Sequence, residues 1–259
     1  MRLDKFLAEA SVGTRKNVRE YIKKGLVKVN GKVTREPSLN INEKVDSIKY
    51  NNNVIEYKGK VYYMFHKPQG CITARKDINT KTVLDFFEDT DMDGIFHVGR
   101  LDKDTEGLLL FTNDGEFEHH LMCPEKHVEK KYFFIALGSL SEEDVNKIEN
   151  GLYIGQGEKI TKPAKLEIIK HGEFEEFEEI NIRDFYKAKT DRYKQPVISG
   201  HLTISEGRKH QVKRMLKAVG CYVIYLKRVA IGNLILDETL EKGKYRALTE
   251  HEVEKLFKQ

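Results

Sequence analysis

The sequence predicts an α+β protein, in which a small basic N-terminal domain precedes a larger domain built on a largely antiparallel, mixed β-sheet with flanking helices. Three observations favour this class. Helical periodicity is confined to a few segments, short β-like runs recur between residues 61 and 204, and neither a regular strand–helix alternation nor an internal repeat is visible. A chain of 259 residues, 39% of them hydrophobic, is long enough to form two domains.

The charge distribution divides the chain. Residues 1–48 hold eleven lysines and arginines against six acidic residues, whereas the rest of the chain holds 34 against 35. A concentrated positive charge on an otherwise neutral protein is typical of a module that binds polyanions. We therefore expect an RNA-binding domain with its linker at residues 1–57 and a second domain at 58–259, with an insertion at about 172–199.

Composition also excludes several classes of protein. No apolar stretch approaches the roughly 20 residues of a membrane helix, and charged residues stand where a signal peptide would carry its apolar core. The three cysteines are far apart in the sequence and have no metal-ligand spacing. We expect a cytoplasmic protein with reduced thiols, without a membrane segment, a disulfide framework or a metal site.

The N-terminal domain is predicted element by element. Apolar residues of segment 3–10 recur at helical spacing, and Thr14 is placed to cap a second helix that ends near Gly25. Asn30-Gly31 then separates two short alternating runs, which is a strong signal for a type I′ hairpin turn. The expected order is therefore helix, helix, hairpin.

A basic stripe lies on the second of these helices. It consists of Arg15, Lys16, Arg19 and Lys23. Most such charge runs are solvated helix faces with no further role. Here the charge is of one sign along one face, and the unit is too small to need it for folding. The stripe therefore favours contact with RNA or another polyanion.

The larger domain contains several short β-like runs and one clear amphipathic helix. Segment 208–219 places its apolar residues on one face and Lys209, Lys213 and Lys217 on another. For Lys209 and Lys217 a solvated surface is the simpler interpretation, and RNA contact is the alternative. The expected strands are 61–65, 95–98, 108–112, 132–136, 165–169 and 201–204.

One stretch carries the most informative chemistry. In GRLDKDTEGLLLFTNDG, residues 99–115, a loop rich in charge leads directly into an apolar strand, which places Asp102 against the core. Asp102 and its neighbours can be turn formers that bond to their own backbone. A calcium loop is a poor match, because the twelfth position is Asn113 instead of a bidentate glutamate. The third interpretation is a nucleophilic carboxylate at the bottom of a cleft, oriented by a nearby cation.

This stretch closely resembles the active-site motif of the pseudouridine synthases, in the RsuA branch. Four other segments also resemble that branch, and the N-terminal pattern RLDKFLAEASVGTRKNVREYIKKGLVKVNGK resembles the S4 RNA-binding domain, an αL-type fold. Those segments are HKPQG at 66–70, EKKY at 129–132, TKPA at 161–164 and LTISEGRKHQVKRMLKAVG at 202–220. The resemblance covers nearly the whole chain, and the long insertion at 172–199 is the main departure from it.

The resemblance implies roles for individual residues. It makes Asp102 the nucleophile, Lys213 its basic partner, and Tyr132 the residue that stacks on an everted uracil. Arg100 is expected either to hold the gap left in the RNA helix when the target nucleotide is extruded or to bind the phosphate of that nucleotide. Arg208 and His210 are weaker candidates for contacts to phosphate or base. No cofactor is expected, because the isomerisation has no redox step.

The expected activity is therefore isomerisation of a specific uridine in small-subunit 16S ribosomal RNA by a monomer, on free RNA or on an assembling 30S particle. Two alternatives remain open: a synthase acting on large-subunit 23S RNA, and a non-catalytic S4-type RNA-binding or ribosome-assembly factor. The sequence does not decide whether Asp102 attacks the ribose or the uracil ring.

Overall fold

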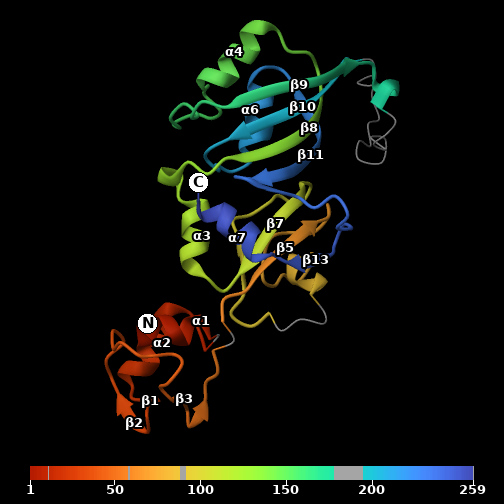
Figure 1. Cartoon of the computed structure of the whole chain (residues 1–259). Helices are drawn as coiled ribbons and strands as arrows, with labels where there is room; N and C mark the ends of the chain where they lie inside the picture. The colour runs from red at the N-terminus through yellow and green to blue at the C-terminus, as the bar shows by residue number, and fades with distance from the viewer. Residues whose placement is uncertain (11, 58, 88–91, 178–194, 259) are drawn as a thin grey trace. The chain divides into compact units, whose positions relative to one another are not determined.

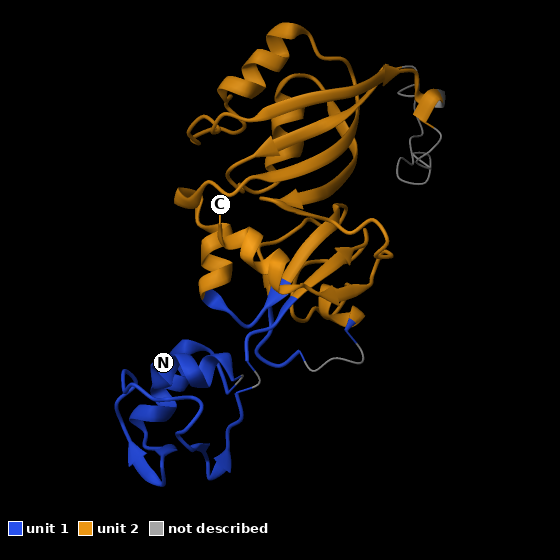
Figure 2. Ribbon diagram, viewed as in Figure 1, with its two compact units in different colours: residues 1–62, 87–96, 111–115 blue, residues 63–86, 97–110, 116–259 orange. Residues whose placement is uncertain are grey.

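The computed structural model describes residues 1–10, 12–57, 59–87, 92–177 and 195–258. Backbone contacts divide the chain into two compact units, coloured separately in Figure 2. The first unit contains residues 1–62, 87–96 and 111–115, and the second contains 63–86, 97–110 and 116–259. The boundary expected from the sequence, at residues 57/58, lies near the end of the first segment of unit 1.

The first unit forms the predicted helix–helix–hairpin arrangement. Thr14 caps the second helix, its Oγ1 accepting a hydrogen bond of 3.2 Å from the Asn17 backbone N–H. Asn30 and Gly31 have φ values of +50° and +81°, the left-handed conformations that a type I′ turn needs. The elements are α1 (Leu3–Glu9), α2 (Arg15–Lys23), β1 (Val27–Val29), β2 (Lys32–Thr34), β3 (Ile48–Tyr50) and β4 (Asn53–Val54), and the sheet order is β2-β1-β3-β4.

A nine-stranded sheet is the main feature of the remaining described chain (Figure 1). β8 pairs antiparallel with β10 and β11, and β7 pairs parallel with β11, so the sheet is mixed and largely antiparallel as predicted. Its order is β13-β5-β7-β11-β8-β10-β9, with β12 on β11 and β6 on β7. The strands are β5 (Tyr62–Lys67), β6 (Phe96–Val98), β7 (Glu106–Thr112), β8 (Lys130–Leu137), β9 (Lys165–Gly172), β10 (Val197–Ile204), β11 (Tyr222–Ile231), β12 (Leu234–Ile235) and β13 (Tyr245–Ala247).

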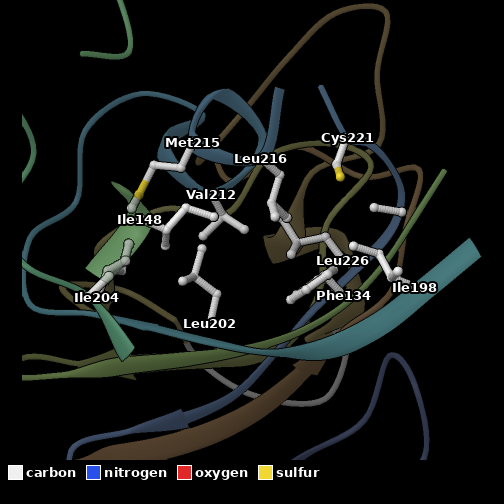
Figure 3. Close-up of a cluster of buried hydrophobic side chains, with 12 residues drawn as sticks. Phe134, Ile148, Ile198, Leu202, Ile204, Val212, Met215, Leu216, Cys221 and Leu226 are labelled. Carbon is white, nitrogen blue, oxygen red and sulfur yellow. The ribbon is translucent and has the colours of Figure 1, made fainter. Parts of the chain in front are cut away.

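Two of the helices cover one face of this sheet. Apolar side chains of α4 and α6 pack against β8, β10 and β11, as the cluster in Figure 3 shows. Burial of this face explains why β8, β10 and β11 alternate apolar residues toward the helices. The helical segments are α3 (Gly115–Met122), α4 (Glu142–Asn150), α6 (Gln211–Ala218) and α7 (Glu250–Phe257), with short 3₁₀ turns at η1 (Val83–Phe86), η2 (Pro124–Lys126) and η3 (Phe174–Phe177).

The structure corrects two expectations about element ends. β5 continues through His66 and Lys67, beyond the end expected at residue 65, because both side chains are buried. Helix α6 begins at Gln211, and His210 before it is left-handed with φ +53°. Lys209 therefore does not lie on the helical face predicted to carry it with Lys213 and Lys217. Of the expected insertion at 172–199, residues 178–194 lie outside the described chain.

Candidate active site

A cavity of about 860 Å³ lies within the second unit. Its walls come from the loop of residues 99–105, the start of β8, the segment 204–212 that leads into α6, and the middle of β11. These pieces are far apart in the sequence, and the order β7-β11-β8-β10 brings them together.

Asp102 lies in this cavity between an ammonium group and an imidazole ring. Its Oδ2 is 3.5 Å from Lys213 Nζ, and its Oδ1 is 3.4 Å from His210 Nε2. The first turn of α6 supplies Lys213, and the left-handed cap residue before that helix is His210. The Asp102 side chain is 30% exposed, so it is open to a ligand entering the cavity.

Lys213 also binds a second carboxylate. Its Nζ lies 2.5 Å from Asp104 Oδ1, closer than to Asp102. Burial raises the pKa of Asp104, but the hydrogen bond and charge of Lys213 outweigh it and leave that pKa below its usual value. Lys213 therefore bridges two acids of the same loop.

Tyr132 lines the same cavity from β8. It lies opposite Leu202 of β10 and Arg228 of β11, so all three point to the face of the sheet that α6 covers. The three residues predicted to act together, Asp102, Tyr132 and Lys213, thus meet around one pocket: Lys213 contacts Asp102, and Tyr132 and Asp102 both line the cavity.

Lys67 holds the loop that carries Asp102 in place through hydrogen bonds to its backbone. This side chain is fully buried, and its Nζ donates to the carbonyl oxygens of Asp102 (2.9 Å), Thr105 (2.9 Å) and Pro68 (3.1 Å). Burial lowers the pKa of Lys67, and the nearby Cys71, Asp104 and Asp102 offset part of this effect. Lys67 therefore fixes the backbone on which the carboxylate stands.

Further hydrogen bonds hold the same loop at Leu101 and Lys103. The Thr73 hydroxyl donates to the Leu101 carbonyl (2.7 Å) and accepts from the Leu101 N–H (3.1 Å). The Gly70 N–H donates to the Lys103 carbonyl at 2.8 Å. Because the backbone of residues 101–105 is held at several points, little reorganisation is needed to present Asp102.

The predicted RNA-contact residues differ in exposure and in how many contacts they already make within the protein. Arg100 is exposed where it lines the cavity. Arg208 instead holds an internal loop, donating to the carbonyls of Lys159 (2.5 Å) and Ile160 (2.7 Å) and pairing with Glu206 at 3.2 Å. This guanidinium is engaged within the protein, which leaves little of it for RNA.

On the basic stripe of α2 there is a similar distinction. Arg19 pairs with the buried Asp4 at 2.8 Å, so it helps to hold α2 against α1. By contrast, Arg15, Lys16 and Lys23 are exposed and form no ion pair in the described part of the chain. Three of the four predicted stripe residues therefore remain available to a polyanion.

Sequence reasoning missed three buried cations around the site: Lys67, Lys130 and Arg228. Lys67 and Lys130 stand inside the HKPQG and EKKY segments, but their spacing gave no sign of burial. A signal for Arg228 was present, because it interrupts the apolar run of β11. A charged residue within a buried strand rarely lacks a role.

Two further properties bear on the function. No group of three or more His, Cys, Asp or Glu side chains that could hold a metal ion occurs among the described residues. Within the same residues, none of the helices combines the length and apolar character that crossing a bilayer requires.

Comparison with known proteins decides the family. Residues 61–218 match the family of RNA pseudouridylate synthases, and residues 1–46 match the S4 domain. The chain belongs to the RNA pseudouridine synthase family. It is therefore an isomerase of the RsuA/RluB type, preceded by an S4 RNA-binding domain, as the sequence motifs implied.

Several full-length relatives are known. The chain is 41% identical to an uncharacterized RNA pseudouridine synthase, YtzG, of Bacillus subtilis, with 98% of this chain and 97% of that one covered. It is 38% identical to the ribosomal small subunit pseudouridine synthase A of Haemophilus influenzae, with all of both chains covered. It is also 39% identical to the ribosomal large subunit pseudouridine synthase B of Bacillus subtilis, covering 98% and 95%. A crystal structure of a pseudouridylate synthase matches with a TM-score of 0.64 at 36% identity, over 99% of both chains.

Proposed function

We propose that this synthase converts a uridine of 16S ribosomal RNA to pseudouridine, with Asp102 as the nucleophile. The observation that carries the proposal is the Asp102 carboxylate standing between Lys213 and His210 in a cavity that Tyr132 also lines. A carboxylate with cationic partners can stay ionised in a partly desolvated pocket, which nucleophilic attack requires.

The reaction detaches uracil from ribose, turns it and rejoins it through C5, with no net gain or loss of atoms. Asp102 can attack the ribose carbon or the ring, and its neighbours Lys213 and His210 serve either route. In this proposal Tyr132, which lines the cavity from β8, stacks against the base. The chemistry needs a nucleophile and an enclosed pocket but no redox cofactor.

The target uridine has to leave its helix to reach Asp102. Extruding a base costs a few kcal/mol, least where it is already unpaired, so a loop or junction is the expected target. Arg100 at the cavity is suited to bind the displaced backbone, and Arg15, Lys16 and Lys23 are suited to bind phosphates elsewhere in the RNA. Phosphate contacts of this kind position the protein without reading sequence.

Small-subunit RNA is proposed as the substrate because relatives named as small subunit enzymes match the chain end to end, including those of Haemophilus influenzae and Escherichia coli. The relative named as a large subunit enzyme is equally similar. Large-subunit 23S RNA is therefore the alternative substrate, and the same experiment compares both.

The test uses release of tritium from 16S and 23S transcripts labelled at C5 of uridine. We expect release from 16S RNA, and we expect Asp102→Asn to lower its rate by at least about 10³-fold while RNA binding is retained. Asp104→Asn is the matched control, because it removes a carboxylate of the same loop that also binds Lys213. Release from 23S RNA alone would reassign the substrate, and native activity of Asp102→Asn would disprove the nucleophile.

A further inference from the structure

Two cations are buried in the wall of the active-site cavity, and the proposed reaction gives neither a role. Arg228 of β11 is 3% exposed, and Lys130 at the start of β8 is 6% exposed. Arg228 lies opposite Tyr132 in the β8–β11 register, on the same face of the sheet. The side chains of directly opposed residues are neighbours, which places the guanidinium beside the residue proposed to stack on the base.

The guanidinium of Arg228 is only partly satisfied within the protein. Its Nε donates to the Leu108 carbonyl at 2.8 Å, whereas Nη2 is buried and has no hydrogen-bond partner among the described residues. A buried donor left unpaired is costly and uncommon, unless a ligand or water completes it.

The backbone of Arg228 is fixed by close approach to Gly107 of β7. Gly107 has φ +106°, and a Cβ at this position would lie 2.2 Å from the Arg228 carbonyl oxygen. Only glycine permits this contact without displacing β11. The position of the unpaired guanidinium nitrogen is therefore set by the packing of two central strands.

No carboxylate neutralises these two charges. In the described chain neither Lys130 nor Arg228 forms an ion pair, and Lys130 donates to the carbonyls of Leu121 (2.9 Å) and Val128 (2.7 Å). Burial and the charge of Arg228 lower the pKa of Lys130 to about 8. Besides Asp102 and Asp104, two other acids line the cavity: Glu206 is bound to Arg208 and Gln211, and Glu118 lies on α3. Neither forms an ion pair with Lys130 or Arg228 in the described part of the chain, so these two charges have no ionic partner in the wall.

The cations of the cavity fall into two groups by exposure. Arg100, Lys103 and Lys209 are exposed, as expected for residues that meet phosphates of a solvated backbone. Arg228 and Lys130 are withdrawn from solvent in the wall of the cavity, so a group has to enter the cavity to come near them. In a nucleotide turned into this pocket, that group is the base.

We infer that Arg228 donates a hydrogen bond from Nη2 to a carbonyl oxygen of the uracil and stabilises the negative charge that develops on the ring. This inference rests on the proposed function, and it holds for both routes of Asp102. Cleavage of the glycosidic bond leaves its electron pair on uracil, spread over N1 and the carbonyl oxygens. Attack of Asp102 at C6 of the ring moves the C5–C6 π pair onto C5 and O4, so on that route the oxygen bound by Arg228 is O4.

Such a donor acts mainly in the transition state. The carbonyl oxygen is neutral in the bound substrate and becomes more negative as the bond breaks, so the hydrogen bond strengthens during reaction. Replacing Arg228 should therefore lower kcat much more than it raises KM. We expect Arg228→Gln to reduce kcat by about 10²-fold, the effect of removing one donor to a developing oxyanion.

The decisive experiment pairs this variant with a change in the base. Oligoribonucleotides spanning the mapped uridine are made with uridine, 2-thiouridine or 4-thiouridine at the target, and pseudouridine formation is followed for each. Sulfur is a weaker acceptor than oxygen. In the native enzyme, sulfur at the bound position weakens the hydrogen bond, so the rate of pseudouridine formation should be about tenfold lower for one of the two thio substrates than for uridine. In Arg228→Gln that hydrogen bond is already absent, so the same sulfur should not lower the rate by this factor.

Arg214→Gln is the matched control. Its guanidinium also makes structural contacts, to Glu158 and to the Ile154 carbonyl, but it lies outside the cavity. The ratio of its rate on uridine to its rate on each thiouridine substrate should equal that of the native enzyme. Should Arg228→Gln fail to fold, Arg228→Lys gives the same readout, since one ammonium group cannot reproduce the guanidinium fork.

The outcomes separate the two proposals. If the native chain forms no pseudouridine in either ribosomal RNA, the proposed function fails. If the native chain is active and a folded Arg228 variant keeps the native ratio at both thio positions, the assignment of Arg228 is overturned. A ratio that changes at one position supports it and identifies the oxygen that is bound.

Discussion

Both parts of this chain are rich in lysine and arginine, but they use these residues in opposite ways. On α2 the cations Arg15, Lys16 and Lys23 are exposed and form no ion pair in the described part of the chain. Around the catalytic cavity, Lys67, Lys130 and Arg228 are each at least nine-tenths buried, and all three bind backbone carbonyls.

This difference separates two tasks of positive charge. An exposed cation attracts phosphates at a distance, is screened by salt and can be exchanged for another at little cost to the fold. A buried cation is held in place by its acceptors, and it affects its surroundings strongly because no water screens it. The first kind supplies affinity and the second kind supplies geometry and reactivity, which the following predictions test.

The largest effect is expected for Lys67→Met. It leaves the carbonyls of Asp102, Thr105 and Pro68 without their buried donor and frees the loop that carries Asp102, the proposed nucleophile. Stability should fall by about 3 kcal/mol in urea unfolding, and kcat should fall by about 10²-fold because a misplacement of 1 Å is enough for such a loss. The exposed Lys126→Met should change neither quantity, and a Lys67→Met enzyme with native kcat would show that the anchor is dispensable.

Lys130 makes the stability of the fold depend on pH in a defined window. Its pKa of about 8 in the folded protein lies below the ordinary value of 10.5. The unfolded chain therefore keeps its proton after the folded chain has lost it, and the contribution of Lys130 to stability rises between pH 8 and 10.5. That contribution is fully present above 10.5 and is lost as the pH falls through 8.

Urea unfolding of the native chain and of Lys130→Met, compared at pH 7 and pH 10, measures the contribution of Lys130 to the free energy of unfolding. The native chain should gain about 3 kcal/mol relative to the variant across the whole window, and somewhat less by pH 10. Other groups that titrate in this range are common to both proteins and cancel. A difference in stability that does not change with pH would mean that Lys130 keeps its ordinary pKa.

The smallest effect on the fold is expected for the exposed stripe. The triple variant Arg15→Gln, Lys16→Gln and Lys23→Gln should melt like the native protein but bind 16S RNA more weakly. The slope of log affinity against log salt concentration should fall by about two, which reflects up to three lost phosphate contacts. Fluorescence anisotropy titrations at several salt concentrations measure this slope.

Arg19→Gln serves as the comparison within the same helix. Because the Arg19 guanidinium is already bound to Asp4, its loss should lower stability and change the salt slope less than the triple variant does. If the triple variant leaves the salt slope unchanged, the stripe of α2 does not contact RNA.

Much of the fold could be predicted because its signals are local in sequence. The hairpin turn at Asn30-Gly31, the cap at Thr14 and the apolar face of α6 each follow from neighbouring residues, and the structure contains all three. The pairing of Asp102 with Lys213 was expected from the resemblance to a family, and the two groups lie 3.5 Å apart. Spacing alone could not have given that pair, since 110 residues separate them.

The sequence by itself determined the family, the order of elements in the N-terminal unit and the choice of Asp102 as the proposed nucleophile. These follow from short patterns whose physical causes, helix periodicity, turn conformation and capping, act between residues close in the chain. Only the tertiary structure decided which cations are buried and what they bind. Burial depends on how β7, β11 and β8 are ordered in the sheet, and that order places Arg228, Tyr132 and the loop of Asp102 around one cavity.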